Sequence, residues 1–71
     1  MIKTYTASMP RDNYDDNLLR LSVYACADND IRKNFKDYRI FSIREDIFIS
    51  TKTETRTLNV TIELIKESEI N

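Results

Sequence analysis

The sequence contains no histidine and no glycine, and it has a single cysteine. Serine and cysteine nucleophiles need an adjacent base, usually histidine, so Cys26 and the serines lack an activating partner. Loops that bind phosphates or dinucleotides need glycine for close approach of the backbone, and zinc sites need several Cys and His ligands. The sequence therefore predicts a protein that is not an enzyme and that holds no cofactor and no metal.

The lone Cys26 excludes an internal disulfide and favours a reducing compartment. We interpret it as a small buried hydrophobe. Residues 1–11 lack the apolar run of a secretory signal, and no later run reaches membrane-spanning length. These features predict a cytoplasmic protein with no membrane segment, and the abundance of Ile, Asn, Asp, Lys and Thr fits a bacterial or phage genome rich in A and T.

The chain has 71 residues, of which 41% are hydrophobic and 32% charged, and its net charge is −1. This size predicts one domain over residues 1–71, with a core that buries only about 60% of the surface of the unfolded chain. Because disulfides and metals are excluded, self-association is the remaining way to reinforce such a core, and a homodimer is one expectation. The balanced charge gives no overall field that would recruit nucleic acid or an anionic membrane.

The first half of the chain predicts two strands and one helix. Threonines and a tyrosine favour a strand over residues 2–9, which Pro10 ends, and Asp and Asn residues form a loop over 11–17. Residues 18–27 fit either a strand, by alternation, or a helical stripe, and we favour the strand. The reason is that Asp28, Asn29 and Asp30 offer capping oxygens for a short helix over about residues 29–38.

The second half predicts a β-hairpin. Two apolar rows alternate with polar residues, namely Phe41, Ile43, Ile47 and Ile49, and then Leu58, Val60, Ile62 and Leu64. If both rows face one core, Ile49 opposes Leu58, and the lack of Gly or Asn favours a four-residue loop over residues 52–55. Glu45 falls in the apolar row, so we expect a β-bulge over residues 44–46 that turns it outward. The polar segment 66–71 is expected to fray.

The predicted fold class is therefore α+β. The predicted element order is β-β-α-β-β, with a mostly antiparallel sheet and one short helix packed on one of its faces. Two groups of carboxylates, in residues 12–16 and 28–30, lack the glycine and glutamate positions of a calcium-binding loop. We interpret them as turn and capping residues.

One basic and aromatic constellation is a candidate binding site. The face of the predicted sheet away from the core carries Arg20, Tyr24, Arg44, Phe48 and Lys52. Aromatic rings and cations of this kind hold single-stranded nucleic acids, and they also anchor protein partners. The plainest alternative is an ordinary sheet surface covered by long basic side chains.

The function that the sequence favours is a small protein-binding module, such as a regulator, an inhibitor or an assembly subunit, that acts through a sheet face or a sheet edge. Binding of single-stranded nucleic acid by Arg20, Tyr24, Arg44, Phe48 and Lys52 is the first alternative. A structural homo-oligomer is the second. Exposed aromatic residues favour a macromolecular partner in each case.

Overall fold

The computed structural model describes residues 1–69. The elements in chain order are β1 (Ile2–Pro10), α1 (Asp16–Asn34), β2 (Tyr38–Ser50), β3 (Thr55–Lys66) and the 3₁₀ turn η1 (Glu67–Glu69). The α+β class with one helix is confirmed. The element order is β-α-β-β, so the predicted order β-β-α-β-β is wrong.

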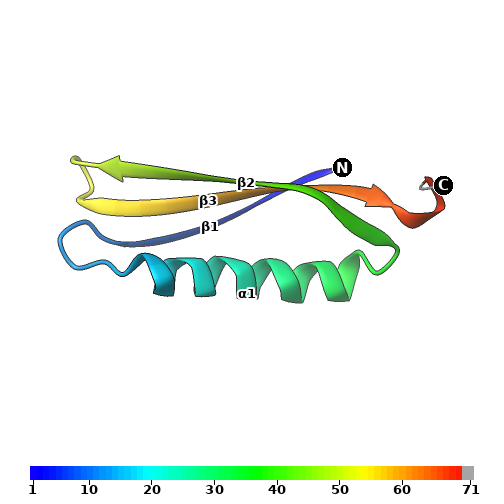
Figure 1. Ribbon diagram of the computed structural model, residues 1–71. Helices are drawn as coiled ribbons and strands as arrows, with labels where there is room; N and C mark the ends of the chain where they lie inside the picture. Colours follow the sequence, from blue (N-terminus) through cyan, green and yellow to red (C-terminus); the bar gives the residue numbers. More distant parts are fainter. Residues whose placement is uncertain (70–71) are drawn as a thin grey trace.

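The three strands form one antiparallel sheet in the order β1-β3-β2, with β3 in the centre and β1 and β2 at the edges. Helix α1 runs along one face of this sheet, as Figure 1 shows, and packs mainly on β1 and β3. The other face carries no second layer in the described part of the chain. The molecule is elongated, with extents of 46 × 16 × 16 Å.

The core lies between α1 and the central strand. Alternate residues of β3, namely Leu58, Val60, Ile62 and Leu64, are at most 1% exposed. They pack against Leu19, Val23 and Ala27 of α1, whose spacing of four residues places them on one helix face. Cys26 is exposed on α1, so its predicted burial is wrong.

The single helix α1 replaces the predicted strand over residues 18–27 and the first part of the predicted helix over about 29–38, because it ends at Asn34 and β2 begins at Tyr38. Asp15 is its N-cap, and the Asp15 carboxylate accepts hydrogen bonds from the backbone N–H groups of Asn17 and Leu18. Asp28 and Asp30 lie inside the helix rather than at its start, where Asp28 accepts from Arg32 and Asp30 accepts from Asn34, each four residues ahead. The helix is 19 residues long, and no helix within residues 1–69 is long and apolar enough to cross a membrane.

The hairpin of β2 and β3 has the predicted four-residue loop, but the loop spans residues 51–54 instead of 52–55. Ile49 opposes Arg56 and Ile47 opposes Leu58, so the register differs from the predicted one by two residues. A shift of two leaves Ile43, Ile47 and Ile49 on their expected face, because successive strand residues alternate between faces.

The β-bulge lies between Ile40 and Ser42 and not over residues 44–46. Phe41 has no partner on β3, whereas Glu45 opposes Val60 and stays on the face that α1 covers. The predicted outward turn of Glu45 is therefore wrong.

Residues 66–69 of the segment that is expected to fray have ordered contacts in the structure, and the fraying itself stays a prediction. Lys66 ends β3, and the backbone N–H of Glu67 donates to the carbonyl oxygen of Asp37 at 2.7 Å. Arg39 also donates to the Glu67 carboxylate at 2.8 Å. Residues 70–71 lie outside the described part of the chain.

Candidate functional site

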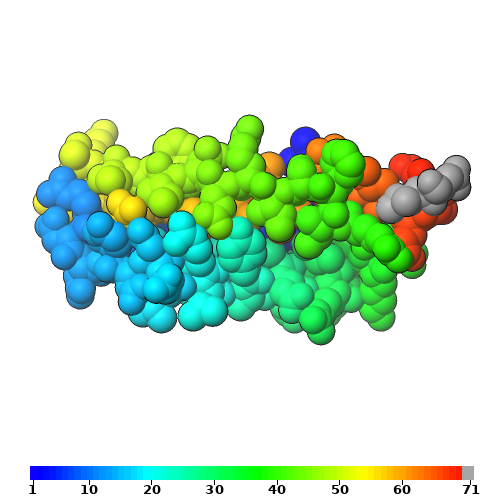
Figure 2. Space-filling model, in the orientation of Figure 1, coloured from blue at the N-terminus to red at the C-terminus, as the bar shows by residue number. Residues whose placement is uncertain are grey.

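Strand β2 exposes an unusual amount of apolar surface for an edge strand. Six of its residues are large hydrophobes that are 40% to 66% exposed. We call them the β2 surface: Ile40, Phe41, Ile43, Ile47, Phe48 and Ile49. In Figure 2 the side chains of β2, coloured green to yellow-green, cover the upper part of the visible face over most of its length, above α1 in blue to green. No strand of the described chain pairs with the outer edge of β2.

The isoleucines of the β2 surface face the same side of the sheet as the core. Ile43 opposes the buried Ile62, and Ile47 opposes the buried Leu58. They remain exposed because a helix about 10 Å wide covers roughly two strands that lie about 4.8 Å apart. Since α1 packs mainly on β1 and β3, it leaves the core-facing row of β2 uncovered.

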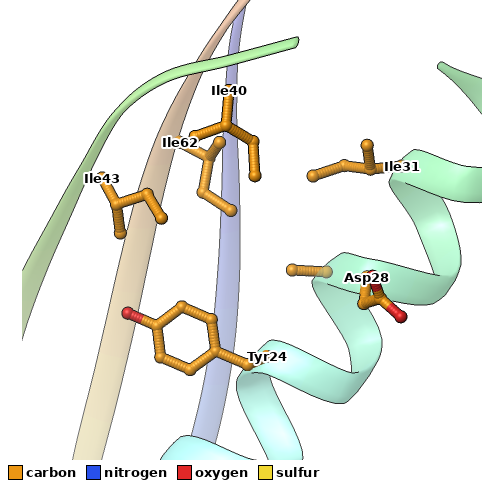
Figure 3. Close-up of a pocket in the computed structure, with 7 residues that line it drawn as sticks. Tyr24, Asp28, Ile31, Ile40, Ile43 and Ile62 are labelled. Atoms are coloured by element: carbon orange, nitrogen blue, oxygen red, sulfur yellow. The ribbon is translucent and has the colours of Figure 1, made fainter. Parts of the chain in front are cut away.

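A groove of about 250 Å³ lies between α1 and β2. Its lining residues are Tyr24, Ala27, Asp28, Ile31, Ile40, Ile43 and Ile62. Figure 3 shows Ile40 and Ile43 of β2 across from Ile31 and Tyr24 of α1, while the carboxylate of Asp28 points away from the strands. The interior of the groove is therefore almost entirely apolar, with its charged group at the rim.

Glu45 interrupts the isoleucine row and joins β2 to the helix. The Tyr24 hydroxyl donates to Glu45 Oε2 at 2.6 Å, and Arg20 Nε donates to Glu45 Oε1 at 3.1 Å. The hydrogen bond from Tyr24 is the main cause that lowers the pKa of Glu45, and Arg20 lowers it further. The same hydrogen bond raises the pKa of Tyr24. Glu45 is thus an ionised, hydrogen-bonded carboxylate between Ile43 and Ile47.

The opposite edge of the sheet is closed by polar and aromatic groups. The Tyr5 hydroxyl of β1 donates to Asp30 of α1 at 2.7 Å, and burial together with this bond raises the pKa of Tyr5 to about 12. The bond from Tyr5 also lowers the pKa of Asp30. The Lys3 ammonium lies 5.2 Å from the centre of the Phe35 ring. The two sheet edges therefore differ: polar contacts join β1 to the helix, whereas an apolar groove lies between the helix and β2.

The five predicted binding residues do not share one face. Arg20 and Tyr24 lie on α1, where they contact Glu45, whereas Lys52 lies in the hairpin loop. Arg44 and Phe48 lie on β2 and face away from the helix, opposite Thr61 and Thr57. The expectation of one sheet face is wrong, because residues 18–27 are helical. These five residues therefore do not form one continuous basic and aromatic face. Binding of nucleic acid by them stays a prediction.

Sequence reasoning missed the exposure of the isoleucines, because it placed Ile43, Ile47 and Ile49 in the core. It also treated Glu45 as a residue to be turned outward. A signal for both lay in residues 41–49, which carry phenylalanine or isoleucine on both strand faces around a central Arg-Glu-Asp triplet. A strand that is buried on one face alone alternates more regularly between apolar and polar residues.

The carboxylates outside this surface have local structural partners. Asp16 accepts two hydrogen bonds from Arg56, at 2.9 and 3.2 Å, and Asp15 caps the helix. Among residues 1–69, no group of three or more acidic, histidine or cysteine side chains is arranged to hold a metal ion. The capping interpretation is confirmed for Asp15 and is wrong for Asp28 and Asp30.

No family model, no curated protein and no solved structure matches this chain. The function is therefore inferred from the geometry of the molecule itself.

Proposed function

We propose that this chain is a non-enzymatic protein-binding module that binds its partner through the β2 surface. The observation that carries the proposal is the exposure of six large hydrophobes, each at 40% or more, on one edge strand. Large apolar patches on a small protein mark interaction sites, because leaving them in water forgoes roughly 25 cal/mol for each Å² that a partner could cover.

The chemistry of an edge strand supports a strand-addition mode of binding. The outer edge of β2 presents unpaired backbone N–H and C=O groups, which a strand of the partner can pair with. Alternate side chains of that strand would extend over the isoleucine row on one face and over Phe48 on the other. The backbone would supply affinity and the side chains specificity.

A role as a regulator, inhibitor or assembly subunit follows from this mode, because a protein that works by covering a partner needs no chemistry of its own. The net charge of −1 gives no general attraction for polyanions, so contacts at the surface would decide the choice of partner. The lone Cys26 favours a reducing compartment, and a cytoplasmic location is part of this proposal.

The test compares the wild-type chain with Ile47→Lys, which places a charge in the β2 surface, and with Thr4→Lys, which places the same charge on the exposed face of β1. Affinity purification after cross-linking, from the cells that naturally make the chain, should recover the same proteins with wild type and Thr4→Lys. Ile47→Lys should lose them, while circular dichroism shows all three folded. Recovery of the same proteins by Ile47→Lys would contradict the proposal, as would a wild-type chain that recovers nothing and is monomeric when pure.

A further inference from the structure

The chain exposes more surface than a compact protein of its mass. Its accessible surface is 5275 Å², whereas a compact monomer of 8.4 kDa exposes about 4,600 Å². The excess of about 650 Å² is close to the roughly 800 Å² that each partner buries in a standard interface. A surface of this size matches that needed for a stable dimer.

The sequence of β2 is symmetric about Glu45. Opposite charges flank it directly, as Arg44 and Asp46, and isoleucines lie two residues away on each side, as Ile43 and Ile47. A two-fold axis beside Glu45 brings each residue of one strand opposite the residue equally far on the other side of Glu45 in the second strand. Such a pattern is self-complementary.

Resting on the proposed function, we propose that the partner is a second copy of this chain, paired antiparallel along β2 with Glu45 beside the two-fold axis. The two three-stranded sheets then form one six-stranded sheet. Opposed residues in an antiparallel pair point to the same face, so both helices lie on one side of that sheet.

Most contacts in this register are favourable on both faces, and the like-charged Glu45 pair at the axis is the exception. On the helix side, Ile43 lies opposite the partner's Ile47, and the reverse pair forms by symmetry. On the other side, Arg44 already forms an ion pair with Asp46 of its own strand at 3.4 Å, and it also lies opposite the partner's Asp46, so the four charges alternate in sign. The two Glu45 carboxylates meet at the axis, but each already accepts hydrogen bonds from its own Arg20 and Tyr24.

Neighbouring registers are unfavourable. A shift of two residues is the smallest that keeps both apolar rows on the helix side. In one direction it places Arg44 opposite the partner's Arg44, and in the other it places Asp46 opposite the partner's Asp46. Both shifts also move Glu45 from the axis to a position opposite an isoleucine. Charge and apolar pattern therefore select the same register.

The other edge of the sheet is less suited to self-pairing. Strand β1 ends at Pro10, which has no backbone N–H to donate, and Ile2 is its only large exposed hydrophobe. Its outward residues Thr6 and Ser8 already form hydrogen bonds to Asn59 and Thr57 of β3. The interface of the second copy is thus placed at β2.

The register is tested with cysteine variants in a Cys26→Ser background. Ile43→Cys and Ile47→Cys, carrying tags of different size, are unfolded, mixed, refolded and oxidised. The proposal expects a disulfide between the two variants, because opposed residues are about 4.5–5.5 Å apart at Cα. Each variant alone should form little of it, since identical residues lie about 13 Å apart along the strands. Thr4→Cys on β1 is the control and should not cross-link.

A charge exchange gives an independent readout of the same register. Arg44→Asp should weaken association at least about tenfold, because two favourable pairs become like-charged pairs. The double variant Arg44→Asp with Asp46→Arg should restore association to near the wild-type level. Failure of the double variant to recover would contradict the proposed register.

The outcomes separate this inference from the proposed function. No disulfide in the mixture, or equal disulfide yields from Ile43→Cys alone and from the mixture, would overturn pairing with a second copy in this register. If the expected disulfide did not form but Ile47→Lys still lost the cellular partners, the protein-binding function would stand, and the partner would be another protein instead of a second copy. No disulfide in the mixture, together with unchanged recovery of cellular partners by Ile47→Lys, would overturn both the second-copy pairing and the protein-binding function.

Discussion

Glu54 is the residue whose backbone departs most from its preferred conformation. Its φ of 56° lies in the left-handed region, and no other residue of the described chain has a positive φ. A residue with a side chain loses roughly 1–2 kcal/mol in this region. The conformation is needed because Glu54 closes the hairpin and its carbonyl oxygen accepts the backbone N–H of Arg11 at 2.8 Å. With no glycine in the chain, glutamate occupies the position.

Replacing Glu54 with a residue that tolerates positive φ should stabilise the protein. We expect Glu54→Gly and Glu54→Asn to raise the free energy of unfolding by about 0.5–1 kcal/mol, measured by urea denaturation. Lys52→Gly is the matched control in the same loop, where φ is not positive, and it should lower stability. Lower stability in both Glu54 variants would show that the backbone strain is not relieved there.

Individual residues explain which local features could be predicted. The missing glycine and asparagine around Thr53 and Glu54 predicted a four-residue loop over residues 52–55, and the observed loop over 51–54 has that length. The position of Glu45 could not be predicted in the same way. Its partners Arg20 and Tyr24 lie on a helix that the alternating pattern had assigned to a strand, so a carboxylate on the core face had no visible partner.

Among the elements, α1 shows how packing overrides local signals. Residues 18–27 fit two periodicities, and the helix is selected because Leu19, Val23 and Ala27 together reach the buried row of β3. The capping signal of Asp28 to Asp30 is overruled, since those side chains find partners within the helix and on Tyr5 of β1. The sequence pattern shows which residues could share a face in a strand or in a helix. It does not show which of the two packs better against the rest of the chain.

The hairpin register cannot be predicted from the alternation of apolar and polar residues alone. Alternation fixes which residues share a face, and it leaves registers that differ by two residues equally acceptable. The choice is made in the loop, where the Ser50 hydroxyl accepts the backbone N–H of Thr53 and the Thr53 and Thr55 side chains bond at 2.7 Å. These contacts begin the loop one residue earlier than predicted.

The link between β2 and α1 should weaken in acid. The hydrogen bonds from tyrosine hydroxyls lower the pKa of Glu45 and that of Asp30, so each carboxylate stabilises the fold above its unfolded-state pKa and ceases to do so as the pH falls through its folded-state pKa. The free energy of unfolding should therefore decline from about pH 5 to below pH 3. Glu45→Gln should flatten this decline, measured by urea unfolding at fixed protein concentration.

Glu69→Gln is the control for the acid prediction, since Glu69 is an exposed residue of η1 and the variant should retain the wild-type dependence. If the stability of Glu45→Gln followed the wild-type curve in parallel across the same pH range, the hydrogen-bonded carboxylate would not be the group that titrates with unfolding.

At the scale of the whole molecule, one helix packs against a sheet of three strands, and this determines which strand is exposed. The α+β class followed from the sequence, but the exposed β2 surface did not, because the predicted elements were more numerous and the helix shorter. In the observed fold, α1 runs along a body 46 Å long and contacts β2 at Glu45 but leaves its isoleucines exposed. The uncovered strand is the basis of our proposal that the monomer is incomplete and pairs with a second copy.

The most direct test of that incompleteness is the molecular mass of the pure protein by sedimentation equilibrium. Wild type should approach twice 8.4 kDa as its concentration rises to about 100 µM, because β2 pairs with β2 of a second copy. Ile47→Lys should remain at 8.4 kDa, and Thr4→Lys should behave as wild type. A wild-type mass of 8.4 kDa at every concentration in this range would contradict the account.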